Sequence, residues 1–261
     1  MNDQRSSLTV TSFNVRCGPA EDGIHSWPHR MHYATTAARS LNADILGLQE
    51  PVDYQVEFFS EQLPEYDWVG VARDDGDRGG EYCAVYVRRT LGEIKNHGTF
   101  WLSDTPEAIG SRTWGNRCVR ICTYAEIALH EPHASAFVFN CHLDHESQYA
   151  REAAVRLIRD RMELIAGGRP TILMGDFNVT PENPALLPLR ESYRDVHADL
   201  PSTEGTFHGF SDAAPFDKID YIWVNPAWEI ERAEIHRDRP EGGYPSDHDP
   251  VSARLTLSLG A

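Results

Sequence analysis

The composition of this 261-residue chain already restricts what it can bind. Asp and Glu number 40 against 24 Lys and Arg, which gives a formal net charge of −16. An acid excess of this size repels phosphate backbones and anionic membranes, so non-specific binding to nucleic acid is disfavoured. Hydrophobic residues make up 41% of the chain and aromatic residues 10%. These fractions are typical of a packed globule and exclude a disordered chain.

Other sequence features bear on where the protein works. No apolar run approaches the roughly 18 residues of a membrane-spanning helix, and the N-terminal segment lacks the pattern of a signal peptide. The five cysteines form no C-x-x-C pair, which favours reduced thiols. We expect a monomer without membrane insertion, located in the cytoplasm unless a signal peptide has been removed from the chain.

Periodicity predicts strands and helices in alternation in the first part of the chain. Residues 8–15 alternate in side-chain character, which indicates a first strand. Ser26 can cap a helix whose apolar residues recur at helical spacing, at Met31, Ala34, Ala38 and Leu41. A buried strand is predicted at 44–48, followed by a second amphipathic helix with apolar positions at Val52, Val56, Phe59 and Leu63.

The rest of the chain is richer in strands. Strand-like segments separated by turn residues lie at 67–71, 82–87, 97–101, 119–129 and 136–142. The longest predicted helix begins near Ser147 and ends at Gly167-Gly168, and strands follow at 171–174, 219–224 and 251–257. Because no repeat or linker divides the chain, we expect one α/β domain over residues 1–261, with a flexible terminus at 1–7.

Polar residues that strand propensity does not explain end or interrupt several of these strands. They are Asn14, Glu50, His142, Asp176, Asn178, Asp220, Asp247 and His248. In α/β proteins, the loops at strand ends are held by a rigid scaffold and commonly bind ligands. We therefore expect these side chains to converge on one site.

The residue types in this set indicate metal-assisted hydrolysis of a phosphoester. Carboxylate and amide oxygens suit a hard ion such as Mg²⁺ or Mn²⁺, which completes its shell with water and substrate phosphate. Such oxygens are offered by Asn14, Glu50, Asp176, Asn178 and Asp247. His142 and His248 can stabilise or protonate a phosphoryl oxygen, and Asp220 can hold one imidazole in the required tautomer.

Six segments, each at the end of a strand-like run, carry a family resemblance. They are SFNVR at 12–16, DILGLQE at 44–50, NCHLDH at 140–145, MGDFN at 174–178, KIDYIWV at 218–224 and PSDHDPV at 245–251. Together they resemble the endonuclease/exonuclease/phosphatase superfamily, which contains DNase I-like nucleases, inositol polyphosphate phosphatases, neutral sphingomyelinases and deadenylases. One such segment is a weak signal, whereas six in the family's order are a strong one.

The resemblance implies a fold and a set of roles. The fold is a four-layer α/β sandwich, DNase I-like, in which two mixed sheets pack face to face with helices outside. The metal would be surrounded by Asn14, Glu50 and Asp247. Asp176 would align or deprotonate the attacking water, and Asn178 would position the phosphate or the water. His248, supported by Asp220, would stabilise charge on the phosphorane, while His142 would bind a phosphate oxygen or assist the leaving group.

Simpler interpretations exist for several of these residues. Asp176 and Asn178 fit an Asx turn, and Asn14 fits a turn. Glu50 can cap a helix that begins near Pro51. In the context of all six segments, we favour the catalytic interpretation.

Weaker candidates for substrate contact are Arg120, Asp144, Trp27, Arg30, Trp101 and His208. Arg120 can clamp a phosphate through its planar guanidinium or form a surface ion pair. Asp144 can instead hold His142 or a loop, Trp27 and Arg30 can instead cap and pack a helix, and His145 is expected to be structural. The loops expected to set selectivity are 18–30, 74–81, 103–117 and 203–215.

Further segments, such as GEYCAVYVRR at 80–89 and GTFWLSDTPE at 98–107, resemble a bacterial subgroup of small family members. The resemblance supplies no substrate for this subgroup. The chain departs from it at Cys141, where Thr is usual, and at Tyr124, where Trp is common.

These observations favour a metal-dependent phosphoric ester hydrolase that uses Mg²⁺ or Mn²⁺ and an activated water to cleave a small phosphorylated substrate. An alternative with the same site is an endo- or exonuclease, for which the local basic residues are Arg120, Arg151 and Arg156. The net charge makes nucleic acid the weaker expectation. A second alternative is a non-catalytic binding domain, against which the complete set of acids and histidines argues.

Overall fold

The computed structural model of the chain describes residues 7–199, 204–213 and 217–258. Its strands form two mixed sheets. The order in the first sheet is β11 (Trp228–Ile235), β12 (Val251–Leu257), β1 (Ser7–Asn14), β2 (Ile45–Val52), β4 (Glu81–Arg88) and β3 (Tyr66–Val69). The order in the second sheet is β5 (Gly92–Trp101), β6 (Ile121–Leu129), β7 (Ser135–His142), β8 (Thr171–Asp176), β10 (Asp220–Val224) and β9 (Arg194–Asp195).

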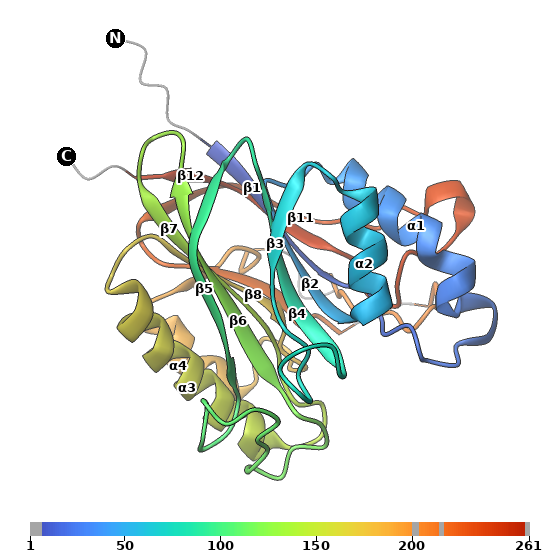
Figure 1. Cartoon of the computed structure of the whole chain (residues 1–261), viewed down its shortest axis with the longest axis horizontal. Helices are drawn as coiled ribbons and strands as arrows, with labels where there is room; N and C mark the ends of the chain where they lie inside the picture. The colour runs from blue at the N-terminus through green and yellow to red at the C-terminus, as the bar shows by residue number, and fades with distance from the viewer. Residues whose placement is uncertain (1–6, 200–203, 214–216, 259–261) are drawn as a thin grey trace.

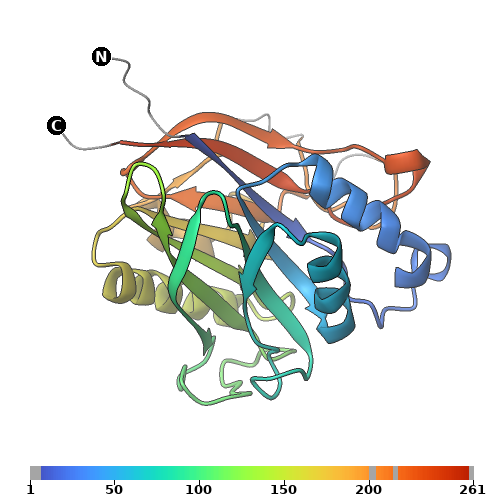
Figure 2. The same cartoon turned by 45° about the horizontal axis from the view of Figure 1, so that its top comes forward.

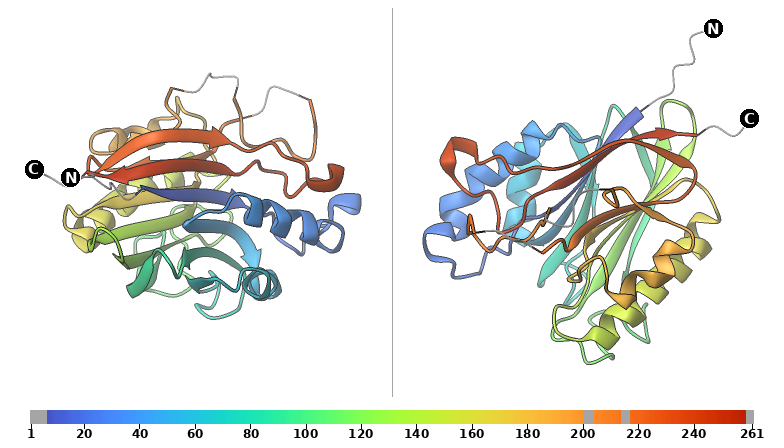
Figure 3. Two further views of the ribbon diagram at one scale, coloured as in Figure 1. Left: turned by 90° about the horizontal axis from the view of Figure 1, so that it is seen from above. Right: turned by 180° about the vertical axis from the view of Figure 1, so that it is seen from behind.

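Helices cover the outer faces of both sheets (Figure 1 and Figure 3). The first sheet carries α1 (Trp27–Ser40) and α2 (Asp53–Gln62), and the second carries α3 (Gln148–Ala166) and the short α4 (Leu187–Arg190). Separate clusters of buried apolar side chains fill the space between the sheets and the space beneath each group of helices. The predicted four-layer α/β sandwich is therefore confirmed.

Several predicted boundaries agree with the helices observed. α1 begins directly after Ser26, although the Ser26 hydroxyl makes no capping hydrogen bond to the described residues. α3 begins after Ser147, whose side chain accepts a hydrogen bond from the Ala150 backbone N–H. It ends at Gly167, which takes the left-handed conformation with φ of 58°. Short 3₁₀ turns lie at Gly23–His25, Pro184–Leu186 and Pro240–Gly242.

The structure adds a strand that periodicity misses, β11. Trp228 and Ile230 are in phase with each other, but the register shifts between Ile230 and Arg232, so Ala233 and Ile235 fall out of phase. A bulge of this kind breaks the alternation by which a strand is recognised in sequence. Two short elements, α4 and β9, are also absent from the predicted set.

The first and last strands lie side by side in the first sheet (Figure 2). Ser7 pairs with Thr256 and is therefore part of β1, so the predicted flexible terminus is wrong at this residue. Residues 1–6 of that terminus lie outside the described residues. No helix in the described part of the chain combines the length and apolar character needed to cross a bilayer.

Alternation along the strands brings polar residues to one end of the space between the sheets. Successive side chains of a strand point to opposite faces, so every second residue shares a face. On β7, Ala136 and Val138 pack between the sheets, and the same row continues to His142. On β8, Ile172 and Met174 lead in the same way to Asp176.

β10 runs in the opposite direction to β8 and delivers its polar residue at the same end. Val224 and Ile222 pack between the sheets, and the row ends at Asp220. Asp220 is the register partner of Asp176, which is in turn the partner of His142 on β7. Three neighbouring strands therefore place His142, Asp176 and Asp220 side by side.

A buried amide pair joins the two sheets just beneath these residues. The Asn140 Nδ2 on β7 donates to the carbonyl oxygens of Leu48 at 2.9 Å and Ala84 at 2.8 Å on the first sheet. Its Oδ1 accepts a hydrogen bond from Gln49 Nε2 at 2.6 Å, and that nitrogen also lies 3.1 Å from Ser12 Oγ. Asn140 and Gln49 are fully buried. Their hydrogen bonds link the sheets where the apolar packing gives way to polar side chains.

Replacing Asn140 by Ala is expected to lower the free energy of unfolding by about 3 kcal/mol, because it leaves two carbonyl oxygens and the Gln49 amide buried without this partner. Urea denaturation measures the change. The matched control is Asn96→Ala at an exposed position of β5, where a loss below about 0.5 kcal/mol is expected. Equal losses in the two variants would contradict the role assigned to the pair.

Candidate active site

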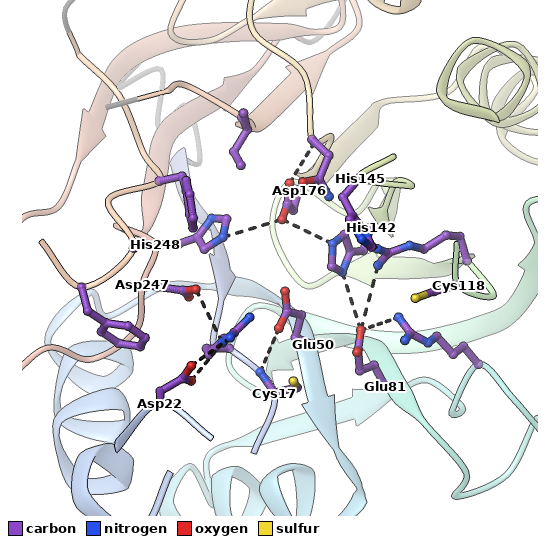
Figure 4. A pocket seen from close by; sticks show the side chains of 18 residues that line it. Cys17, Asp22, Glu50, Glu81, Cys118, His142, His145, Asp176, Asp247 and His248 are labelled. Atoms are coloured by element: carbon purple, nitrogen blue, oxygen red, sulfur yellow. Dashed lines mark hydrogen bonds and ion pairs between the residues drawn. The ribbon is translucent and has the colours of Figure 1, made fainter. Parts of the chain in front are cut away.

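A cleft of about 480 Å³ lies at the end of the sandwich where the polar rows meet. Of the predicted catalytic and metal-binding residues, those that line it are Glu50, His142, Asp176, Asn178, Asp247 and His248 (Figure 4). Asn14 and Asp220 are buried directly behind them and contact them through hydrogen bonds. The eight side chains are therefore brought together, as the sequence predicts. Their individual roles stay predictions.

Asp176 is the centre of this group. Its Oδ2 accepts a hydrogen bond from Asn14 Nδ2 at 2.9 Å, and its Oδ1 accepts one from the Asn178 backbone N–H at 2.9 Å. The same Oδ2 lies 3.4 Å from His142 Nε2 and 3.8 Å from His248 Nε2. One carboxylate thus faces an imidazole on each side.

The two histidines have opposite electrostatic surroundings. Burial lowers the pKa of His248, but the nearby carboxylates of Asp220, Asp247 and Asp176 outweigh it and raise the pKa well above its ordinary value. Asp220 Oδ2 lies 2.8 Å from His248 Nδ1. Burial, reinforced by the positive charges of Arg120 and Arg73, lowers the pKa of His142 well below its ordinary value. The surroundings thus favour the charged form of His248 and the neutral form of His142.

The charge of Asp176 is also set by its surroundings. Burial and the neighbouring carboxylate of Asp220 raise the pKa of Asp176 to about 7. Burial likewise raises the pKa of Asp247. The shifts indicate that negative charge in the cleft is incompletely neutralised by the side chains around it.

Glu50 reaches the cleft through an irregular backbone. The pairing of β2 with β4 is interrupted between Gln49 and Val52, and Glu50 has a φ of 70°, in the left-handed region that non-glycine residues seldom adopt. Its carboxylate accepts hydrogen bonds from Asn14 Nδ2 at 2.9 Å and the Cys17 backbone N–H at 2.8 Å. Because α2 begins at Asp53 with Val52 at its N-cap, Glu50 does not cap this helix.

The donor set fits a hard divalent ion. Glu50 and Asp176 hydrogen-bond to the same nitrogen of Asn14, and ligand atoms of Glu50, His142 and Asp176 lie within 4.8 Å of one another. Asn14 turns its Nδ2 toward the two carboxylates, while its Oδ1 accepts a hydrogen bond from the Arg16 backbone N–H at 3.0 Å. Asp247 lies beside Arg16, with Oδ2 3.6 Å from Arg16 Nε. Crowded carboxylates of this kind are the ligands that Mg²⁺ and Mn²⁺ prefer.

The weaker candidates separate into one residue that lines the cleft and several that do not. Arg120 lines it. Trp27 packs against Phe58 and Phe59 beneath the first sheet, away from the cleft. Arg30 is fully buried and donates to the carbonyl oxygens of Val15, Arg16 and Pro245, so it anchors two loops of the site from behind.

The other three weaker candidates hold loops. Trp101 is buried and donates through Nε1 to the Arg73 carbonyl oxygen at 2.7 Å. His208 accepts a hydrogen bond from the Phe210 backbone N–H and lies 3.5 Å from Asp249. Asp144 accepts backbone hydrogen bonds from residues that include Arg117 and Ser147, which is the loop-holding interpretation of that residue.

Sequence reasoning misses a larger set of lining residues, which are Arg16, Cys17, Asp22, Arg73, Glu81, Cys118, Phe207, Gly209, Phe210 and Ile219. His145, expected to be structural, also lines the cleft. The predicted selectivity loops 18–30, 74–81 and 203–215 contribute to this set through Asp22, Glu81 and Phe207, whereas 103–117 contributes no lining residue. Residue 203 and residues 214–215 of the last loop lie outside the described residues.

Comparison with known proteins settles the family. The sequence model of the Endonuclease/Exonuclease/phosphatase family matches residues 11–248. The chain belongs to the endonuclease/exonuclease/phosphatase family. Cys141, one of the two positions at which the sequence departs from the bacterial subgroup, is buried in the apolar cluster beneath α3. It lies on the face of β7 opposite His142. Tyr124 packs against Phe139 in the same cluster.

Several solved structures can be superimposed on nearly the whole chain. A family member from Bacteroides vulgatus is 31% identical with a TM-score of 0.91, over 97% of this chain and 100% of that chain. A structure named as a mannosyl-6-phosphatase of Bacteroides thetaiotaomicron is 31% identical with a TM-score of 0.87, over 95% of this chain and 99% of that chain. The human Nocturnin catalytic domain shares the fold at 19% identity, with a TM-score of 0.77 over 97% and 95% of the two chains. No curated protein sequence matches the chain.

Replacing Asp220 by Asn is expected to lower the pKa of His248 by about one pH unit or more, because the carboxylate that favours the charged imidazole is lost while the burial that opposes it remains. NMR titration of the imidazole signals in metal-free protein measures the shift. Asp217→Asn, an exposed position in the preceding loop, is the control and is expected to leave the titration in place. An unchanged His248 pKa in Asp220→Asn would count against the pairing of these two residues.

Proposed function

We propose that this protein is a divalent-metal-dependent hydrolase that cleaves a phosphoester bond in a small molecule by in-line attack of water. The observation that supports the proposal is the position of the Asp176 carboxylate between His142 and His248. The two imidazoles have pKa values shifted in opposite directions by their neighbours. A base with an acid beside it is the arrangement that such a hydrolysis requires.

Each side chain then has a definite task. Asp176, with a pKa of about 7, accepts a proton from the attacking water. Charged His248 donates a hydrogen bond to a phosphate oxygen as negative charge develops on it, and Asp220 keeps the imidazole charged and oriented. Asn178 holds Asp176 through its backbone N–H and holds the neighbouring loop through Nδ2, which donates to the Leu143 carbonyl oxygen.

Glu50 and Asp247 are the residues that would hold the divalent ion, and Asn14 would orient Glu50 and Asp176 beside it through the hydrogen bonds of its Nδ2. When bound, the ion would supply positive charge that polarises the phosphate and offsets the carboxylates around it. The need for such charge is consistent with the lining of the cleft, in which five carboxylates face three arginines among the described residues.

Several observations support a small substrate over a polymer. The lining has an excess of carboxylates, and the chain as a whole has a net charge of −16. Both disfavour a long polyanion. Of the basic residues considered for a nuclease, Arg120 lines the cleft, whereas Arg151 donates to the Asp144 carbonyl oxygen and Arg156 pairs with Glu152 on α3. The 31% identity to the structure named as a mannosyl-6-phosphatase also supports a phosphorylated small molecule.

A panel of phosphate monoesters and diesters, together with DNA and RNA oligonucleotides, tests the proposal. We expect hydrolysis of small esters in Mg²⁺ or Mn²⁺, with loss of activity in EDTA and recovery on addition of the metal. Asp176→Asn and His248→Ala are each expected to lower kcat by a factor of about 10² to 10⁴, because each removes a proton-handling group. Calorimetric titration with Mn²⁺ is expected to show weaker binding to Glu50→Gln than to the unmodified protein.

The matched control is His130→Asn, an exposed position far along the second sheet, which is expected to keep full activity. Turnover that persists in EDTA, or that survives Asp176→Asn unchanged, would refute the proposed chemistry. Cleavage of oligonucleotides in preference to small esters would support the nuclease alternative.

A further inference from the structure

One end of the cleft contains charged residues that the proposed chemistry leaves without a task. Arg73 lies in the loop after β3, Glu81 begins β4, and Arg120 directly precedes β6. All three line the cleft together with Cys118, His142 and His145, and we call these six residues the arginine bay. In Figure 4, Glu81 lies on the opposite side of Glu50 from Asp247, so the bay and the Asp247 side flank the centre of the site.

Glu81 links the two guanidinium groups of the arginine bay. Its Oε2 forms an ion pair with Arg73 Nη1 and lies 4.0 Å from Arg120 Nη1. The same oxygen lies 3.9 Å from His142 Nδ1. The carboxylate is thus shared by three neighbours and does not form a bidentate pair with either arginine.

The two arginines retain buried donors that have no acceptor. The Arg120 side chain is 4% exposed, and its Nε and Nη1 have no hydrogen-bond partner among the described residues. Its Nη2 lies 2.9 Å from His145 Nδ1. Arg73 Nε likewise has no hydrogen-bond partner in the described part of the chain. These unpaired atoms are enclosed in the protein, so a ligand in the cleft would contact each guanidinium through its cleft-lining side. Because a buried and incompletely paired charge is costly, acceptor oxygens placed there would add affinity.

The composition of the bay favours hydroxyl groups over a second phosphate. A phosphate oxygen can only accept hydrogen bonds, and an ionised Glu81 among the arginine donors would repel a phosphate placed there. A hydroxyl both donates and accepts, so it can receive a hydrogen bond from Arg73 or Arg120 and donate one to Glu81. Two guanidinium groups around one carboxylate therefore match neighbouring hydroxyls of a polyol or a sugar.

His142 connects the bay to the reacting centre. Its Nε2 lies 3.4 Å from Asp176 and its Nδ1 lies 3.9 Å from Glu81, so one imidazole ring spans the interval between the two carboxylates. A phosphate beside Asp176 and hydroxyls beside Glu81 would then be only a few bonds apart. Both groups would then fit within one small molecule.

We propose that Arg73, Glu81 and Arg120 bind the hydroxyl groups of the leaving group, and that the substrate is a phosphorylated sugar or polyol. This inference rests on the proposed phosphohydrolase function and specifies its substrate class. Arg120 is thereby assigned to the leaving group, and the phosphate clamp considered from the sequence is replaced.

Calorimetry in Mg²⁺ with two phosphonates tests the inference without turnover, because carbon replaces the ester oxygen. The probes are the methylene phosphonate of a hexose 6-phosphate and 2-cyclohexylethyl phosphonate, which has a ring and a linker of the same size without hydroxyls. We expect the unmodified protein to bind the hexose compound at least about tenfold more tightly, since a site built for hydroxyls rejects an analogue that lacks them. Glu81→Gln is expected to abolish most of that preference.

Glu126→Gln is the matched control. Glu126 lies on β6, pairs with Arg169 and has a side chain that is 20% exposed, compared with 18% for Glu81. It is expected to keep the preference for the hexose compound. Arg120→Lys, which keeps the charge but loses the fork of donors, is expected to reduce the preference and decides the question if Glu81→Gln fails to fold.

Equal binding of the two phosphonates, no binding of the hexose compound at millimolar concentration, or an unchanged preference in both bay variants would overturn the inference. Tighter binding of a hexose bisphosphonate than of the monophosphonate would overturn it in favour of a second anion site. Hydrolysis of phosphoesters together with equal phosphonate binding would leave the proposed function standing without the hydroxyl site. A retained preference for the hexose compound without hydrolysis of any ester would support the hydroxyl site and contradict the proposed hydrolase function.

Discussion

The buried amide pair of Gln49 and Asn140 is the constraint from which the rest of the site follows. An amide enclosed in an apolar interior is costly unless its hydrogen bonds are made, so the two sheets are held where Asn140 can bond to Gln49 Nε2 and to the carbonyl oxygens of Leu48 and Ala84. Glu50 follows Gln49 directly, and His142 is the next residue after Asn140 on the same face of β7. The hydrogen bonds at 2.6, 2.8 and 2.9 Å therefore set how the carboxylate of one sheet stands against the imidazole of the other.

Above that pair, the cleft gathers more negative charge than its own side chains neutralise. Burial and like-charge repulsion raise the pKa of Asp176 to about 7, even though charged His248 lies on one side of it. Arg16 offsets part of the charge of Asp247, but it is shared with Asp22. The local fold thus leaves a deficit of positive charge next to Glu50, and this deficit is the physical basis for expecting a divalent ion there.

Alternation in the sequence predicts most of the strands, and the motifs at their ends predict which polar residues meet. This works for His142, Asp176 and Asp220 because each is the last member of a row whose earlier members pack between the sheets. It fails for β11, where a bulge shifts the phase. It also cannot connect Arg73, Glu81 and Arg120, because they come from separate loops and no spacing in the sequence relates them. Trp27 and Arg30 show the opposite error. Both lie within a predicted selectivity loop in the sequence, but their side chains are buried and do not line the cleft.

The arginines of the bay and the chemistry at Asp176 are linked through His142. A histidine placed between two carboxylates would ordinarily be charged, because each carboxylate favours the imidazolium form. Here burial lowers the pKa of His142, and the positive charges of Arg120 and Arg73 lower it further. The same guanidinium groups that we assign to the hydroxyls therefore favour the neutral form of this imidazole, whereas the surroundings of His248, on the opposite side of Asp176, favour the charged form. Specificity and protonation state therefore depend on one pair of side chains, because a substitution that removes either guanidinium group from the bay also removes positive charge from beside His142.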